Sequence, residues 1–225
     1  MATIDKVTDG VWSLNSAGTR SVAVEFADHV VMLEGPTSDA RSKVVNDLVR
    51  KTIPNKPIKY VVNTHAHYDH AGGLREYVAE GITVITHESN KAFYEQAWSR
   101  PRTVEDTAPT TNAPMIETVA DKRVLSDGTR SVELYYLAGH QHHSGQLIAY
   151  LPKERILMYG DGYNPPAGDE IRTPERGPEY AAQLVDKVNE FKLKPDRIAP
   201  VHGRVVPYRN LLMAFDLAPT QPARR

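Results

Sequence analysis

Three histidines and one aspartate lie within six residues of one another, as His65, His67, Asp69 and His70. Imidazole nitrogens and carboxylates are costly to bury without partners, and a bound metal ion satisfies all of them at once. His65 and His67 alternate along an extended segment and can reach one metal, whereas Asp69 and His70 follow a turn at Tyr68 and can reach a second. The spacing predicts a site for two metal ions; a histidine-rich surface loop without metal is the alternative.

The segment before this cluster is an apolar run, Ile58–Val62, which predicts a short buried strand. The run ends at Asn63 and Thr64, so the cluster falls in the loop at the carboxyl end of that strand. Open α/β sheets bind their ligands at this end of their strands. The position therefore favours a functional site over a surface loop.

The segment Thr64–Gly73, with the sequence THAHYDHAGG, resembles the THxHxDHxGG signature of hydrolases with the metallo-β-lactamase fold. Three later segments resemble further metal-binding motifs of the same family. They are Leu147–Pro152, the strand that follows the third histidine ligand, Leu157–Asp161, which ends in a carboxylate, and Pro200–Gly203, which contains His202. The resemblance spans nearly the whole chain.

The chain departs from the family pattern at residues 139–145, where Gly-His-Gln-His-His-Ser-Gly replaces the usual Gly-His-Thr. Three histidines therefore compete for one ligand position. His140 keeps the preceding glycine, but His142 keeps the family's spacing to Gly145 and to the following strand, whose register fixes which side chains face inward. We predict His142 as the ligand. His140 and His143 are then neighbours of the ligands, substrate-facing groups or loop residues.

The resemblance implies two metal ions that share one carboxylate. One metal is expected to be held by His65, His67 and His142, the other by Asp69, His70 and His202, with Asp161 bridging them. Taken alone, Asp161 is typical of a turn and His202 of a buried structural histidine, so only their joint placement predicts a site. The chain has no cysteine, which leaves nitrogen and oxygen ligands. Zinc is expected, although iron or manganese fits the same ligand set.

These ligands predict a zinc-dependent hydrolase. Two metal ions a few ångströms apart lower the pKa of a shared water molecule, which gives a metal-bound hydroxide at neutral pH. Asp69 is expected to orient this hydroxide or to pass its proton to the leaving group. The resemblance to thioesterases and lactonases of the family, which have a bridging carboxylate, implies an ester, lactone, thioester or amide of a small molecule as the substrate.

Other functions stay open. A β-lactam hydrolase is less favoured, because β-lactamases with this signature usually lack a bridging carboxylate such as Asp161. A phosphodiesterase acting on RNA is less favoured because no basic patch is visible. Diiron redox proteins of this fold normally carry a flavin domain, for which 225 residues leave no room. The full ligand set disfavours a relative that has lost its metals.

Four residues near the ligands are candidates for substrate contacts. They are Tyr163 and Asn164, just after the bridging aspartate, Arg204, just after the last histidine, and His140. Packing in a turn is the competing interpretation for Tyr163, and a surface charge is the competing interpretation for Arg204.

The remaining elements follow from hydrophobic periodicity and turn residues. Expected strands are Gly10–Leu14, Ser21–Phe26, His29–Leu33, Ile82–Thr86, Ser131–Leu137, Gln146–Leu151, Arg155–Tyr159 and Arg197–Ala199. Expected helices are Ala40–Thr52, capped by Ser38 and stopped by Pro54, Leu74–Glu80, Asn90–Trp98 and Glu179–Phe191, with a surface loop over Arg100–Pro114. Each half is a β-rich run followed by helices, which predicts two sheets packed face to face with helices outside. The four-layered αββα sandwich of the family, an α/β fold with two mixed sheets, has this arrangement.

The composition is that of an ordinary globular protein, with 40% hydrophobic and 24% charged residues, and we expect residues 1–225 to form one domain. The net charge of -1 gives no field that attracts nucleic acid or an anionic membrane, so a small molecule is the expected partner. The oligomeric state stays open. No run of about 18 apolar residues and no signal peptide is visible, which favours the cytoplasm. A chain without cysteine is also compatible with a secreted or periplasmic origin.

Overall fold

The first half of the chain forms a seven-stranded mixed sheet. In the computed structural model, which describes residues 2–100, 112–168, 171 and 178–216, its strands lie side by side in chain order. They are β1 (Thr3–Thr8), β2 (Val11–Ser16), β3 (Thr19–Glu25), β4 (Val30–Leu33), β5 (Ile58–Val62), β6 (Thr83–His87) and β7 (Ile116–Val119). The strands β1 to β4 form an antiparallel meander, and β4 to β7 run parallel to one another.

The second half of the chain forms a six-stranded mixed sheet, in the order β13-β12-β11-β10-β9-β8. Its strands are β8 (Lys122–Ser126), β9 (Ser131–Tyr136), β10 (Leu147–Leu151), β11 (Ile156–Tyr159), β12 (Arg197–Pro200) and β13 (Val206–Pro207). The pair β11 and β12 is parallel, and the other neighbouring pairs are antiparallel.

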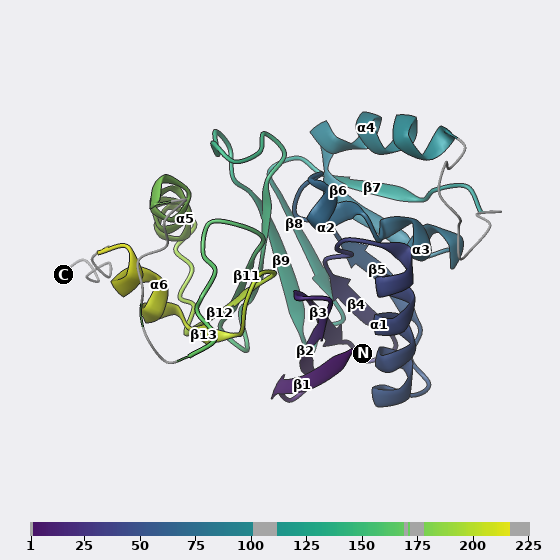
Figure 1. Cartoon of the computed structure of the whole chain (residues 1–225), viewed down its shortest axis with the longest axis horizontal. Helices are drawn as coiled ribbons and strands as arrows, with labels where there is room; N and C mark the ends of the chain where they lie inside the picture. Colours follow the sequence, from purple (N-terminus) through teal and green to yellow (C-terminus); the bar gives the residue numbers. More distant parts are fainter. Residues whose placement is uncertain (1, 101–111, 169–170, 172–177, 217–225) are drawn as a thin grey trace.

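Helices cover the outer face of each sheet. On the first sheet they are α1 (Asp39–Thr52), α3 (Leu74–Ala79) and α4 (Glu88–Ser99), and on the second α5 (Pro178–Glu190) and α6 (Tyr208–Ala214). Figure 1 shows the two helical layers on opposite sides of the molecule with both sheets between them. A one-turn helix, α2 (Tyr68–Ala71), follows β5. The predicted αββα sandwich is confirmed.

The alternation of side chains along β10 shows how the layers are held together. Leu147, Ala149 and Leu151 belong to the apolar cluster between the two sheets, whereas Ile148 and Tyr150 belong to the cluster beneath α5 and α6. Successive side chains of a strand point to opposite faces, so a strand buried on both faces is apolar throughout. This central strand therefore packs on both sides and holds the loop before it in a fixed place.

The strands and helices expected from the sequence are present, and most of their boundaries lie within a few residues of the expected ones. The cap of α1 is confirmed, because Ser38 Oγ accepts a hydrogen bond from the backbone N–H of Arg41 at 3.3 Å. The elements that were not expected are β1, β7, β8, β13, α2 and α6. Three of these strands are exposed or partly exposed over most of their length, so they lack the apolar alternation that predicts a strand. The loop expected over Arg100–Pro114 falls largely on residues 101–111, outside the described residues.

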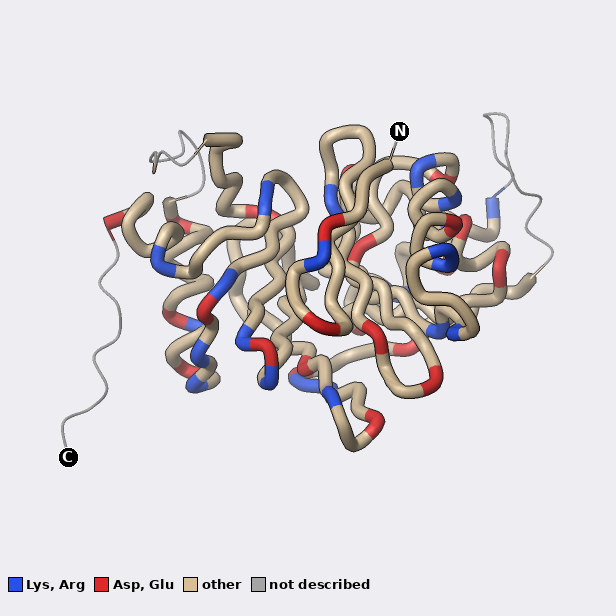
Figure 2. Tube along the Cα trace, turned by 90° about the horizontal axis from the view of Figure 1, so that it is seen from below, with Lys and Arg blue, Asp and Glu red and all other residues tan. Residues whose placement is uncertain are grey.

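Figure 2 shows acidic and basic residues interspersed along the elements of the face that it presents. In the described part of the chain, no helix combines the length and the apolar character needed to cross a bilayer.

Candidate metal centre

The predicted metal ligands lie at the ends of strands from both sheets. His65, His67 and α2 follow β5, while Asp161 follows β11 and His202 follows β12. Because β11 and β12 run parallel, their carboxyl ends open at one edge of the sheet. The strand β10 is antiparallel to β11, so the loop that precedes it, with His142, reaches the same edge. Four segments far apart in the sequence thus meet there.

The first group of potential metal ligands contains three imidazoles whose nitrogens face one another. His67 Nδ1 lies 3.1 Å from His65 Nε2 and 3.1 Å from His142 Nε2, and the latter two nitrogens are 3.2 Å apart. Asp161 Oδ2 adds a fourth ligand atom, 2.8 Å from His142 Nε2 and 3.4 Å from His65 Nε2. All four atoms lie within 4.8 Å of one another.

This geometry fits a tetrahedral metal ion. Zinc binds imidazole nitrogen at about 2.0–2.1 Å, which places neighbouring ligand atoms of a tetrahedron about 3.3 Å apart. Three neutral imidazole nitrogens that converge on one point direct lone pairs at one another, and a cation between them removes that repulsion. The donors of the first group are therefore arranged as metal ligands.

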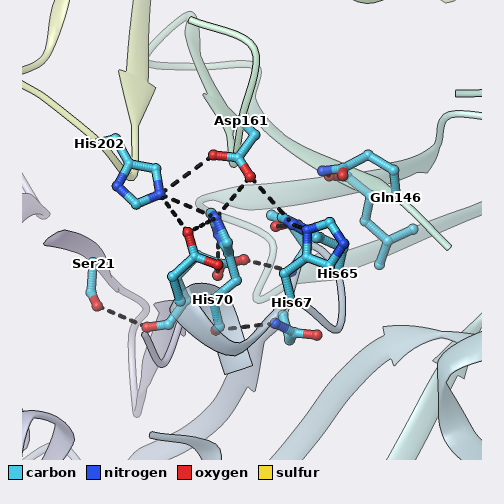
Figure 3. A network of polar contacts seen from close by, with 12 residues as sticks. Ser21, His65, His67, His70, Gln146, Asp161 and His202 are labelled. Carbon is cyan, nitrogen blue, oxygen red and sulfur yellow. Dashed lines mark hydrogen bonds and ion pairs between the residues drawn. The ribbon is translucent and has the colours of Figure 1, made fainter. Parts of the chain in front are cut away.

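The second group shares Asp161 with the first. His202 Nε2 lies 3.1 Å from Asp69 Oδ2 and 3.3 Å from His70 Nε2. Asp161 Oδ2 lies 3.1 Å from His70 Nε2, and its other oxygen, Oδ1, lies 3.4 Å from His202 Nε2. Figure 3 shows the carboxylate of Asp161 above His70 and between His202 and His65, with contacts to each of them. The arrangement matches two metal positions joined by one carboxylate.

A buried glutamate that was not predicted from the sequence supports the second group. It contacts the ring nitrogen of His70 that faces away from the other potential ligands. Glu34, directly after β4, is fully buried, and its Oε2 lies 3.2 Å from His70 Nδ1. Its Oε1 accepts a hydrogen bond from the backbone N–H of Thr64 at 2.5 Å, and its carbonyl accepts one from Ser21 Oγ at 2.8 Å. A carboxylate behind a metal-binding histidine fixes the ring orientation and strengthens the ligand.

Two signals point to Glu34. In the sequence it is a charged residue at the end of the apolar strand His29–Leu33, and β4 is the parallel neighbour of β5, so their carboxyl ends meet. In the structure its backbone has φ +74°, a conformation that is costly for a residue other than glycine and is concentrated at functional sites.

Burial and the neighbouring carboxylates give two of the histidine ligands opposite protonation. Burial lowers the pKa of His65 to about 2, so its ring stays neutral and its lone pair is available to a metal. Burial also favours a neutral His70, but hydrogen bonds to Asp161 and Glu34 outweigh burial and raise the pKa of His70 to about 10. Burial opposes charge on Asp161 as well, yet hydrogen bonds from His142 and other histidines hold the pKa of Asp161 well below its usual range. The carboxylates thus attract a cation to His70, either a proton or a metal ion.

Neither His140 nor His143 belongs to the two groups of potential ligand atoms in the described residues. His140 is 6% exposed, accepts a hydrogen bond at Nδ1 from the backbone N–H of His142 (3.3 Å), and lies 2.9 Å from the Tyr159 hydroxyl through Nε2. The ring centroid of His143 lies 5.2 Å from that of His67. His140 therefore supports the loop of His142 from inside the protein, and its contact with a substrate stays a prediction.

The other candidates for substrate contacts lie apart from the ligand groups. Tyr163 is 2% exposed and packs against Phe215, with 6.0 Å between ring centroids, so the structure places it in the core; its contact with a substrate stays a prediction. Asn164 is exposed, and its contact with a substrate stays a prediction. Arg204 donates from Nε to the carbonyl of Pro166 (3.3 Å) and from Nη2 to that of Gly168 (2.5 Å), which ties two loops together.

A buried polar network joins the two ligand loops to one helix. Asn63 Nδ2 donates to the carbonyl of His70 at 3.2 Å, and Asn63 Oδ1 accepts from the Tyr94 hydroxyl at 2.5 Å. Asn90 Nδ2 donates to the carbonyl of Gly145 at 3.2 Å, in the loop that carries His142. Tyr94 and Asn90 both belong to α4, so this helix positions ligands from both sheets.

Comparisons with known proteins find relatives of the chain by sequence. The chain is 24% identical over 159 residues to the 2,4-dinitroanisole O-demethylase subunit alpha of Nocardioides sp. (strain JS1661), a match that covers 71% of this chain and 45% of that subunit. It is 25% identical over 162 residues to the N-acyl homoserine lactonase of Bacillus thuringiensis, covering 71% of this chain and 61% of the lactonase. The chain thus spans about half the length of these curated relatives.

The fold and the family are shown by two further matches. A metallo-beta-lactamase from Pontibacter korlensis has a similar structure, with a TM-score of 0.72 over 96% of this chain and 98% of that chain, at 18% sequence identity. A sequence model of the metallo-beta-lactamase superfamily matches residues 19–202, a span that contains every residue of the two ligand groups. The chain therefore belongs to the metallo-beta-lactamase superfamily.

Proposed function

We propose that the chain is a dinuclear metal-dependent hydrolase that cleaves an ester, lactone, thioester or amide bond of a small molecule. The observation that carries the proposal is the position of Asp161. Its Oδ2 lies 2.8 Å from His142 Nε2 in one ligand group and 3.1 Å from His70 Nε2 in the other. A carboxylate shared in this way suits two metal ions held close together, as in the two-metal sites of hydrolytic enzymes.

The ligand set suits divalent ions, and zinc is the metal that we propose, because imidazole-rich sites of nitrogen and oxygen donors favour it. His65, His67, His142 and Asp161 would hold one ion, and Asp69, His70, His202 and Asp161 the other. Bound there, the ions would acidify a water molecule and polarise a carbonyl group.

Asp69 is the group that we assign to proton transfer. Its side chain is 49% exposed, whereas the His70 side chain beside it is fully buried. Its Oδ2 is 3.1 Å from His202 Nε2, which holds the carboxylate at the second ligand group while leaving it open to solvent. A carboxylate in this position can orient a water molecule, accept its proton and deliver that proton to a leaving group.

The likeness to the lactonase supports this substrate class. On the face that Figure 2 shows, acidic and basic residues are interspersed, whereas a polynucleotide would require an extended basic region. The test is a panel of substrates: p-nitrophenyl acetate, an acylated homoserine lactone, a thioester, nitrocefin and bis-p-nitrophenyl phosphate. The expected result is metal-dependent turnover of a carbonyl substrate.

A variant of the shared carboxylate and a matched control complete this test. Asp161→Ala should lose both bound metal and turnover, while Glu95→Ala, on the exposed face of α4, should lose neither. Turnover that is unchanged after the metal is removed, or turnover of the phosphodiester alone, contradicts the proposal.

A further inference from the structure

A chain of three hydrogen bonds runs from the first turn of α1 to the second ligand group. Arg41, in α1, donates from Nη1 to Ser21 Oγ at 2.7 Å. Ser21, in β3, donates in turn to the backbone carbonyl of Glu34 at 2.8 Å, a contact that is drawn in Figure 3. The carboxylate of Glu34 lies 3.2 Å from His70 Nδ1. The chain thus connects a helix and two strands to a potential metal ligand.

All four residues of this chain are buried. Ser21, Glu34 and His70 are 0% exposed, and Arg41 is 4% exposed. Bulk water is not available to replace a lost hydrogen bond at such positions, so each contact determines the orientation of the next group. Burying a guanidinium group is also costly unless its donors are satisfied. The contacts of Arg41 are therefore expected to have specific effects on the groups that they reach.

The arginine fixes the direction in which the Ser21 hydroxyl donates. A guanidinium group has donors only, so Ser21 Oγ must accept from Arg41 with a lone pair. A hydroxyl has a single hydrogen, and that of Ser21 is left for the carbonyl of Glu34. Arg41 Nη2 donates to the carbonyl of Thr19 at 3.1 Å, so the guanidinium group is held at two points. The arginine thus orients the serine, and the serine holds the glutamate.

The carbonyl that Ser21 contacts belongs to a strained residue. The backbone of Glu34 has φ +74°, which costs free energy for a residue with a side chain and persists only where the surroundings impose it. Its N–H donates to the carbonyl of Val62 at 2.8 Å, and its own carbonyl accepts from Ser21, so both polar groups of the backbone are fixed. The backbone conformation sets the direction of the side chain, and with it the position of the carboxylate at His70 Nδ1.

We propose that Ser21 and Arg41 are positioning residues for the second metal ion, which act by holding Glu34 in the conformation that orients His70. The inference rests on the dinuclear site proposed above, and it extends the support of that site by two layers of side chains. Neither Ser21 nor Arg41 belongs to the two groups of potential ligands.

The first ligand group depends less on this chain. The Nδ1 atom of His65 lies 3.0 Å from Thr64 Oγ1, so a hydroxyl, rather than the carboxylate of Glu34, orients this ring. The contacts therefore predict that a break in the chain affects one metal ion more than the other.

The test is a titration of the metal-free protein with zinc against a competing chelator, which gives a dissociation constant for each ion. Ser21→Ala should raise one constant about 3- to 30-fold and change the other by less than about twofold. In crystals of this variant with limiting zinc, the anomalous peak among Asp69, His70 and His202 should be the weaker one. Ser42→Ala is the matched control, because Ser42 is equally buried and its hydroxyl has no hydrogen-bond partner among the described residues.

A double-mutant cycle tests whether the two residues act in series. Removal of a positive charge by itself favours a cation nearby, so the effect of Arg41→Met is compared in two backgrounds. With Ser21 present, the substitution also frees the hydroxyl to turn away from Glu34. Arg41→Met should therefore weaken zinc binding about threefold more with Ser21 present than in the Ser21→Ala background. Circular dichroism and urea unfolding check the fold of each variant, and Ser21→Ala decides alone if Arg41→Met does not fold.

Loss of affinity for one ion in Ser21→Ala, with unequal effects of Arg41→Met in the two backgrounds, supports the proposal. Equal zinc constants in Ser21→Ala and Ser42→Ala, equal losses at both ions, or the same effect of Arg41→Met in both backgrounds overturns it while leaving the dinuclear site intact. A wild-type protein that binds fewer than two zinc ions contradicts the dinuclear site itself, and the positioning role is then rejected with it.

Discussion

At the scale of single residues, the proposed metal centre depends on groups outside the two sets of potential ligands. Glu34 receives hydrogen bonds from His70 and from the backbone of Thr64, and it is fully buried. Each of its oxygens has one donor, so the carboxylate is matched to its surroundings. A neutral amide in its place turns one of these contacts into two donors facing each other.

Glu34→Gln should therefore weaken metal binding by about 10- to 100-fold, since removal of a partner behind a metal ligand has effects of that size. Competition with a fluorescent zinc chelator measures the affinity. Glu95→Gln, at an exposed position of α4, serves as the matched control. Equal zinc affinities in the two variants would show that Glu34 does not support the site.

The buried histidines also predict how the metal-free protein responds to pH. Burial lowers the pKa of His65 to about 2 and that of His140 to about 4, while the same side chains in the unfolded chain titrate near 6.5. Below about pH 6.5 the unfolded state thus binds more protons, and the free energy of unfolding should fall by about 1.4 kcal/mol per pH unit for each such histidine. The pKa of His70 is raised to about 10, so its contribution is complete below pH 6.5 and is lost as the pH rises through 10.

Urea unfolding of the metal-free protein at pH 7.5, 6.0 and 5.0 measures this dependence. Stability should fall across the series, and His140→Asn should make the fall less steep because one titrating group is removed. A free energy of unfolding that is constant or increases from pH 7.5 to 5.0 would be inconsistent with neutral, buried imidazoles.

At the scale of elements, the ends of β5 and β11 approach each other so closely that only glycine fits between them. A Cβ atom at Gly160, the residue before Asp161, would lie 2.7 Å from Thr64 Oγ1 and 3.3 Å from the Cε1 atoms of His65 and His70. These side chains are buried, and protein interiors are closely packed.

Gly160→Ala should lower the free energy of unfolding by about 1–3 kcal/mol, as overpacking of a core does, and should also weaken metal binding because it displaces two ligands. Gly168→Ala is the control, since a Cβ atom there meets nothing within 4 Å. Urea unfolding and zinc affinity measure the two effects. A Gly160→Ala protein as stable and as tightly metal-binding as Gly168→Ala would contradict the close approach.

At the scale of the whole molecule, the sequence predicted the fold class. It also predicted the residues that the structure brings together in two groups of potential metal ligands, because their motifs are local. The histidine cluster is six residues long, and the later ligands each end or precede an apolar strand. The one ambiguous position, among His140, His142 and His143, was predicted from strand register, and in the structure His142 reaches the first ligand group. The single domain over residues 1–225 stays a prediction.

The features that the sequence did not predict depend on contacts between distant segments. Glu34 reaches His70 only because β4 and β5 are neighbours in the sheet, and Tyr163 packs in the core because α6 follows far along the chain. The edge strands β1 and β7 carry little apolar alternation and are held in place by their partners in the sheet. Such pairings are properties of the folded chain, so no local pattern indicates them.

The central claim is that two metal ions lie on either side of Asp161. Anomalous diffraction at the zinc edge, from crystals of the zinc-loaded protein, tests it most directly. We predict two peaks, one among His65, His67 and His142 and the other among Asp69, His70 and His202, with the Asp161 carboxylate between them. A single peak, or peaks away from these residues, would contradict the dinuclear site.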